Sequence, residues 1–126
     1  MMIAIELKAF IKDYWDTISG KPKSPQLLRQ FMKDEELIGH IMAFETPFPS
    51  YELIAEEYIC EKDKVSVIGR TLGTHKGDFM GFLPTGKSID LPFSVIYQIK
   101  DDMIVKSWLF FDSMELMRQL GISSQN

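Results

Sequence analysis

The sequence has few cysteines and histidines, the residues that cross-link small proteins by disulfides or bind structural metals. Its 126 residues include a single cysteine, Cys60, and only two histidines, His40 and His75. One cysteine excludes an intramolecular disulfide framework, and the lack of a Cys/His cluster argues against a structural zinc site. Uncharged apolar runs are far shorter than the roughly 20 residues that a transmembrane helix needs, so we expect no membrane partner.

Basic residues are also in the minority. The chain carries 14 lysines and arginines against 18 aspartates and glutamates, which gives a net charge of −4. Nucleic-acid-binding domains usually show the opposite balance, with the basic residues gathered in a patch. The sequence contains no such cluster, and we therefore expect no nucleic-acid partner. Residues 1–8 have no basic segment ahead of their apolar residues, so they do not resemble a secretory signal, and a cytoplasmic protein is expected.

Large apolar residues, in contrast, are plentiful. Hydrophobic residues make up 45% of the chain, and the aromatic ones comprise nine Phe, four Tyr and two Trp. A length of 126 residues suits one domain covering residues 1–126, which can bury a core without staples. The open question is whether these side chains fill a solid core or line a pocket.

The first half of the chain is predicted to be helical. Apolar residues recur at helical spacing over residues 3–18, and Gly20 follows as a stop signal. A second, short helix is predicted over residues 25–32, with Ser24 as its N-cap and a proline at its first position. A third is predicted to begin after Asp34 and to end near Phe44, before two prolines.

The second half is predicted to form strands. Alternating or continuous apolar segments lie at residues 53–61, 65–72, 89–100 and 103–111, and the glycine-rich residues 77–87 indicate a loop. A last helix over residues 113–120 follows. The order predicts an α+β fold: a cone-shaped, curled antiparallel sheet packed by three N-terminal helices, with a short C-terminal helix. The inside of such a cone is a natural place for an apolar pocket.

Several motifs in the second half occur in a recognisable order. Residues 73–81 read GTHKGDFMG, residues 84–87 read PTGK, and residues 104–108 read IVKSW. Asp112 follows, and residues 119–121 read QLG. With these motifs, about half of the chain resembles the SnoaL-like polyketide cyclases, the ester cyclase branch of the nuclear-transport-factor-2-like superfamily.

The resemblance implies a cystatin-like or nuclear-transport-factor-2-like fold, a homodimer whose sheets pack together, and a pocket that works without a cofactor. The family's characterised cyclases close a ring in a polyketide ester by an intramolecular aldol reaction. In this reaction a carboxylate removes a proton from a carbon beside a carbonyl. We therefore expect a small apolar or aromatic substrate that is cyclised or isomerised. The alternatives are a non-catalytic binding protein for such a metabolite and a dimeric interaction module.

Two residues are the expected catalytic groups. Asp112 stands at the position of the family's catalytic aspartate, four residues after Trp108, and is the expected general base. An apolar wall would raise the pKa of such a carboxyl and make it a useful base. The alternative is an N-cap of the last helix, since Glu115 three residues later completes a pattern typical of a capping box. His75 is expected either to orient a carbonyl or, alternatively, to hold the glycine-rich loop.

Six further residues are expected to bind the substrate, from the first helix, the third helix and the last two strands: Tyr14, Trp15, His40, Gln98, Trp108 and Phe110. Core packing is the alternative for the two aromatic residues of the first helix. Strand alternation allows only one of Tyr97 and Gln98 to face the cavity. Trp108 and Asp112 share the parity of Gln98, which favours Gln98 unless a bulge reverses the face.

Two departures from the family pattern affect the pocket. The family's pocket histidine before the last hairpin is absent from residues 97–99, and Ser107 replaces a second one just before the tryptophan. An apolar loop segment, Met80 to Leu83, lies between glycines. Such a segment is typical either of a flexible lid or of a dimer contact.

Overall fold

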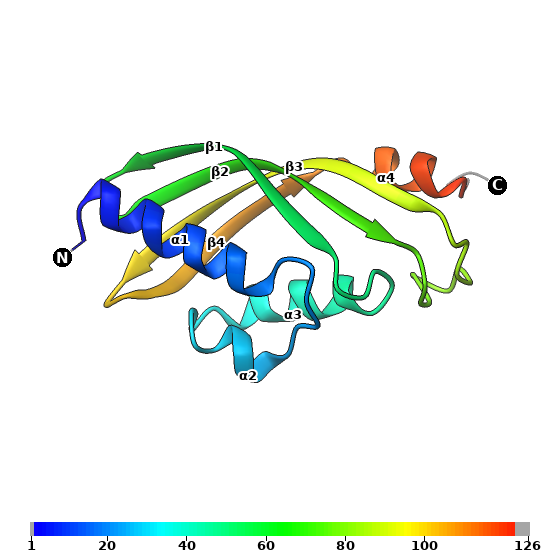
Figure 1. Ribbon diagram of the computed structural model, residues 1–126, viewed down its shortest axis with the longest axis horizontal. Coiled ribbons are helices and arrows are strands. Elements are labelled where there is room, and N and C mark those ends of the chain that lie inside the picture. Colours follow the sequence, from blue (N-terminus) through cyan, green and yellow to red (C-terminus); the bar gives the residue numbers. More distant parts are fainter. Residues whose placement is uncertain (1, 123–126) are drawn as a thin grey trace.

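A computed structural model describes residues 2–122 as a curved four-stranded antiparallel sheet with helices against its concave side (Figure 1). The strands lie side by side in the order β1-β2-β3-β4. This confirms the predicted α+β class. The elements in chain order are α1 (Ala4–Ile18), α2 (Pro25–Leu28), α3 (Glu35–Glu45), β1 (Glu52–Glu61), β2 (Lys64–Thr74), β3 (Ser88–Lys100), β4 (Met103–Phe111) and α4 (Ser113–Leu120).

Helix α1 has the buried stripe that its sequence predicts. Its inward residues recur every three or four positions, from Leu7 through Ile11 to Ile18. Its start is fixed by Glu6, whose Oε1 accepts the backbone N–H of Ile3 at 2.9 Å. None of the helices in residues 2–122 is long and apolar enough to cross a membrane.

Helix α2 is shorter than predicted and ends at Leu28 instead of Met32. The reason is a tertiary contact with the edge of the sheet. Ile104 in β4 donates its N–H to the carbonyl of Phe31 at 2.9 Å, and its carbonyl accepts the N–H of Lys33 at 2.8 Å. Met32 therefore forms a parallel β-bridge with Ile104, which is incompatible with a helical continuation.

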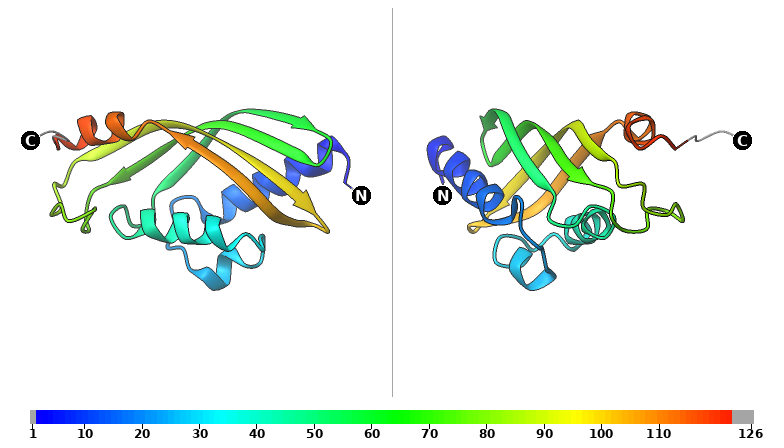
Figure 2. Two further views of the ribbon diagram at one scale, coloured as in Figure 1. Left: turned by 180° about the vertical axis from the view of Figure 1, so that it is seen from behind. Right: turned by 45° about the vertical axis from the view of Figure 1, so that its right-hand side comes forward.

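The sheet is curved, and the β1–β2 and β3–β4 pairings each contain one register shift. The register shifts between Ala55 and Glu57 in β1 and between Gln98 and Ile99 in β3. The β3–β4 turn places both Asp101 and Asp102 at positive φ, 51° and 61°, as a type I′ hairpin turn requires. Figure 2 shows α4 at the end of the sheet that is remote from the N-terminus, away from α2 and α3.

Gly69 in β2 allows α1 to approach the sheet closely. A Cβ there would lie 2.4 Å from the carbonyl oxygen of Ile54 and 3.2 Å from two ring carbons of Trp15. The Trp15 indole stacks on Phe93 of β3, with ring centroids 5.7 Å apart. The core therefore runs between α1 and the concave face, where the candidate site also lies.

Candidate functional site

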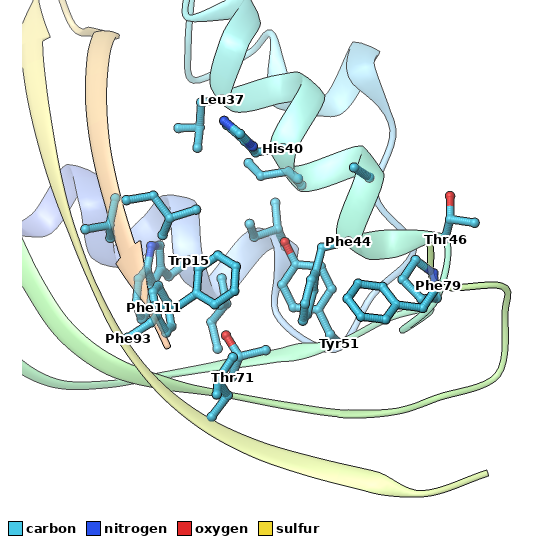
Figure 3. Close-up of a pocket in the computed structure, with 18 of the residues that line it drawn as sticks. Trp15, Leu37, His40, Phe44, Thr46, Tyr51, Thr71, Phe79, Phe93 and Phe111 are labelled. Atoms are coloured by element: carbon cyan, nitrogen blue, oxygen red, sulfur yellow. The ribbon is translucent and has the colours of Figure 1, made fainter. Parts of the chain in front are cut away.

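A cavity of about 580 Å³ lies between the concave face of the sheet, α1 and α3 (Figure 3). Its volume falls in the range of pockets that hold drug-sized ligands. Most of its lining is aliphatic or aromatic. The many aromatic residues of the sequence therefore line this cavity in part and fill the solid core in part.

Aromatic contacts hold the cavity walls in place. Phe44 at the end of α3 stacks on Phe48, with centroids 4.6 Å apart, and meets the ring of Tyr51 edge-on at 5.0 Å. On the other side, Tyr14 meets Tyr97 edge-on at 5.9 Å. Because these rings are locked by their neighbours, the walls are largely pre-formed.

Three of the residues that line the cavity are tyrosines, namely Tyr14, Tyr51 and Tyr97. Burial is the largest cause that raises the pKa of each of them well above the ordinary value. Their hydroxyls therefore stay neutral and act as hydrogen-bonding groups. The indole Nε1–H of Trp15 donates to the Tyr97 hydroxyl at 2.8 Å.

Apart from the tyrosines, the described lining contains two ionisable side chains. His40 lies on α3 beside the cavity, as Figure 3 shows. Asp78 lies on the loop between β2 and β3, and its Oδ2 accepts the N–H of Gly81 at 3.2 Å. Across residues 2–122, no group of three or more His, Cys, Asp and Glu side chains is arranged to hold a metal ion.

The β2–β3 loop closes one side of the cavity. Phe79 and Phe82 exchange backbone hydrogen bonds of 3.0 and 2.8 Å across a two-residue turn at Met80 and Gly81, both of which have positive φ. Phe79 and Met80 line the cavity, although Met80 is 80% exposed. The apolar segment expected to act as a lid therefore lies next to the cavity and contributes to its wall.

Of the residues expected to bind substrate, Tyr14, Trp15 and His40 lie in the lining. Gln98, Trp108 and Phe110 lie instead on the opposite, convex face of the sheet. Trp108 pairs with Ile96 and Phe110 with Ser94 on that face. Gln98 donates from Nε2 to Oδ2 of Asp63 at 3.0 Å, at the far end of the strand.

Tyr97, and not Gln98, faces the cavity, so the interpretation that favoured Gln98 is wrong. Alternation correctly places Gln98 and Trp108 on one face, but that face is the convex one. The buried row of β3 contains Val95 and Tyr97 and continues on β4 with Leu109 and Phe111 in the lining. The helices against the concave side decide which row is buried.

Asp112 lies outside the cavity lining, at the start of α4. Its Oδ1 accepts the backbone N–H groups of Met114 at 3.0 Å and Glu115 at 3.1 Å, and the residue is exposed. Its neighbour Phe111 does line the cavity. Glu115 does not complete a reciprocal capping box, because its carboxylate binds Arg118. The N-cap alternative therefore describes the contacts of Asp112 in this structure.

His75 is fully buried and also lies outside the lining. Its Nδ1 accepts the backbone N–H of Thr85 at 3.1 Å, its own N–H donates to the carbonyl of Lys87, and its carbonyl accepts the N–H of Gly86. Its ring lies against Phe48. These contacts join the two ends of the β2–β3 loop, as the alternative interpretation of this residue expects.

Sequence reasoning did not single out several residues that line the cavity. Tyr51 and Thr71 both place hydroxyls there, and Phe44 and Phe93 form walls (Figure 3). The alternation of Phe93, Val95 and Tyr97 carried a usable signal. Tyr51 follows a proline-rich segment with no periodicity, so no pattern in the sequence indicates its role.

Comparisons with known proteins identify the family and support the fold. The family model described as "SnoaL-like polyketide cyclase" matches residues 11–120. The fold is similar to that of AclR from Streptomyces galilaeus, described as a candidate hydroxylase (TM-score 0.83, 18% identity, 98% of this chain and 86% of that chain). It is also similar to TsrD from Streptomyces laurentii (TM-score 0.81, 17% identity, 98% and 100%).

A SnoaL-like polyketide cyclase from Agrobacterium tumefaciens is a third structural relative (TM-score 0.73, 18% identity, 91% of this chain and 98% of that chain). At these identities, the solved structures support the fold alone. No curated protein matches the chain in sequence.

Proposed function

Since the chain belongs to the SnoaL-like polyketide cyclase family, we propose that its cavity binds a polyketide-like, apolar or aromatic small molecule and promotes ring closure or isomerisation. The observation that carries the proposal is the pre-formed aromatic cavity of about 580 Å³. Apolar walls favour a ligand with little exposed polarity, and the few hydroxyls fix its orientation.

The chemistry starts with removal of a proton from a carbon beside a carbonyl. In an aldol closure, that carbon then bonds to a second carbonyl carbon of the same molecule, whose oxygen takes up a proton. The step is redox-neutral, and we propose that it proceeds without a cofactor. It does need a proton acceptor in contact with the substrate.

We propose His40 as this acceptor. It is the imidazole in the cavity wall, and histidine is the side chain most often used for proton transfer in enzymes. The family resemblance implies Asp112 in this role. In this structure, however, the Asp112 carboxylate accepts two backbone N–H groups at the start of α4, outside the lining.

Ligand binding is tested with the two tryptophans, which lie on opposite faces of the sheet. Trp108→Phe leaves Trp15 in the cavity as the only indole. We expect 2-bromonaphthalene, a flat probe whose bromine quenches on contact, to quench this variant saturably. The matched control is Trp15→Phe, which retains only Trp108 on the convex face and should show no saturable quenching. Equal behaviour of the two variants would contradict binding in the cavity.

Proton removal is tested with 2-tetralone, an apolar ketone whose α-hydrogens exchange measurably in D₂O. We expect the wild type to accelerate this exchange, as followed by NMR, and His40→Gln to abolish the acceleration. Asp112→Asn is the control and should retain it. The reverse result would return the role of base to Asp112. Binding without any acceleration would favour a non-catalytic binding protein, an alternative that the lack of a buried carboxylate in the lining supports.

A second copy of the chain is the partner that we propose for the convex face. Large apolar side chains are exposed there, among them Ile54 at 43%, Ile68 at 40% and Phe110 at 56%. Arg70 lies opposite Ile54 on this face, and its charge is paired with those of Asp90 and Glu56. A two-fold packing of such faces would bury these residues.

Light scattering coupled to size exclusion tests this arrangement. We expect a dimer for the wild type and a monomer for Phe110→Glu. The control is Ile5→Glu, because Ile5 is 77% exposed on α1, away from the convex face. A wild-type monomer would contradict the proposal.

A further inference from the structure

Three of the four tyrosines of the chain line the cavity, from three different elements. Tyr14 comes from α1, Tyr51 from the segment before β1, and Tyr97 from β3. We infer that their hydroxyls form a subsite for a ligand oxygen that carries negative charge, namely an enolate or phenolate oxygen. The inference rests on the proposed function, since it assigns a specific polar contact within the same cavity.

The three tyrosines stand around one cavity, and the rings of two of them, Tyr14 and Tyr97, are in contact. Beside burial, which is the largest cause, the proximity of Tyr97 further raises the pKa of both Tyr14 and Tyr51. The rings of Tyr14 and Tyr97 meet edge-on, with centroids 5.9 Å apart, so these two tyrosines are neighbours.

The hydrogen bonds within the group leave donors available for a ligand. The Tyr97 oxygen accepts the Trp15 Nε1–H at 2.8 Å. In residues 2–122, no hydrogen bond uses the O–H proton of Tyr97 or of Tyr51. A phenol oxygen that accepts a bond becomes a stronger donor through its own hydrogen, because the bonds polarise one another. Trp15 thus strengthens the bond that Tyr97 can donate to a ligand.

Lys23 holds the ring of Tyr51 in position. The buried Lys23 Nζ lies 3.9 Å from the ring centroid, donates to the Tyr51 carbonyl at 2.9 Å and lies 3.3 Å from Glu45 Oε1. Its position is therefore set before any ligand binds. Donors that are fixed in advance in an apolar site stabilise a developing oxyanion without reorganisation.

The charge of the subsite selects an anionic oxygen over a neutral one. The hydroxyls are neutral because burial raises their pKa, so they donate to an anion without adding charge of their own. Hydrogen bonds to a charged acceptor are roughly twice as strong as those between neutral groups. Removal of an α-proton from a bound ketone creates such an oxygen, and the subsite would stabilise the enolate.

The test uses naphthalene and a series of substituted 2-naphthols of increasing acidity. Dissociation constants are measured in the Trp108→Phe background through Trp15 fluorescence. We expect 2-naphthol to bind more tightly than naphthalene, and affinity to rise with the acidity of the naphthol. Tyr97→Phe and Tyr51→Phe keep the ring and remove one hydroxyl. Each should weaken binding of the most acidic naphthol by about tenfold or more, as expected for a bond to a charged group, and leave naphthalene almost unchanged.

The matched control is Tyr58→Phe, because Tyr58 is the one tyrosine outside the described lining. It should bind every probe like the wild type. The inference is overturned if Tyr97→Phe and Tyr51→Phe, shown to be folded by circular dichroism, bind the acidic naphthols like the wild type. It is also overturned if affinity does not follow acidity. Naphthalene binding without a preference for naphthols would leave the cavity function intact, whereas binding of neither probe would refute both proposals.

Discussion

Gly69 is the position where a single added methyl group should disturb both the fold and the cavity. In Gly69→Ala, the new Cβ would lie 2.4 Å from the backbone oxygen of Ile54 and 3.2 Å from the Trp15 ring. The oxygen belongs to the neighbouring strand β1 and cannot rotate away, so either β1 or α1 must shift. Overpacking of this kind costs about 1–3 kcal/mol. For a domain of this size, we expect the melting temperature to fall by roughly 5–10 °C.

The control for Gly69→Ala is Gly39→Ala on α3. A Cβ at Gly39 meets nothing within 4 Å, and the residue is exposed in the middle of a helix. Alanine should therefore stabilise the protein by about 0.5–1 kcal/mol. Guanidinium unfolding followed by circular dichroism measures both variants, and Trp15 fluorescence reports the displacement at the cavity. If Gly69→Ala were as stable as the wild type, the close packing of α1 on β2 would be refuted.

Three further predictions concern groups around the site. Asp112→Ala removes the N-cap of α4 and should lower the free energy of unfolding by about 1 kcal/mol without changing the affinity for 2-bromonaphthalene; a large loss of affinity would refute a purely capping role. Hydrogen bonding to Arg118 lowers the pKa of Glu115 from 4.5 to about 2. Its stabilising contribution is therefore complete above about pH 4.5 and is lost as the pH falls towards 2, and Glu115→Gln should reduce this acid dependence of the urea midpoint. Lys23→Met leaves the partly buried Glu45 without its ion-pair partner and should lower the free energy of unfolding by about 3 kcal/mol. The double variant Lys23→Met/Glu45→Gln should regain part of this stability, as measured by thermal unfolding.

The local elements of the second half could be predicted closely. The bounds of β4 and α4 agree with the prediction because the signals are local: the turn at Asp101 and Asp102, the cap at Asp112 and the left-handed Gly121. The family could be identified from motifs in the same region, and the family model extends the match to residues 11–120. Helix α2 ends early because Phe31 and Lys33, which follow it, bond to Ile104 in β4, and no local signal encodes that contact.

The candidate site could be predicted only in part. Tyr14 and Trp15 lie on the helical stripe of α1, so periodicity placed them facing the sheet. For the strands, periodicity shows that Gln98 and Trp108 share a face but does not show which face the helices cover. That choice depends on the packing of α1 and α3, which involves residues far apart in the sequence. Because the helices cover the concave face, Tyr97 lines the cavity and Gln98 does not.

The bridge between Met32 and Ile104 also bears on self-association through open strand edges. An unpaired edge is a template for the addition of further chains, and this bridge occupies part of the outer edge of β4. The opposite edge, β1, carries exposed glutamates at positions 52, 57 and 61, whose charges repel another edge, while Glu56 pairs with Arg70. Replacement of Glu52, Glu57 and Glu61 by glutamine would remove this repulsion at β1. Edge-to-edge association of such a variant should therefore begin at β1.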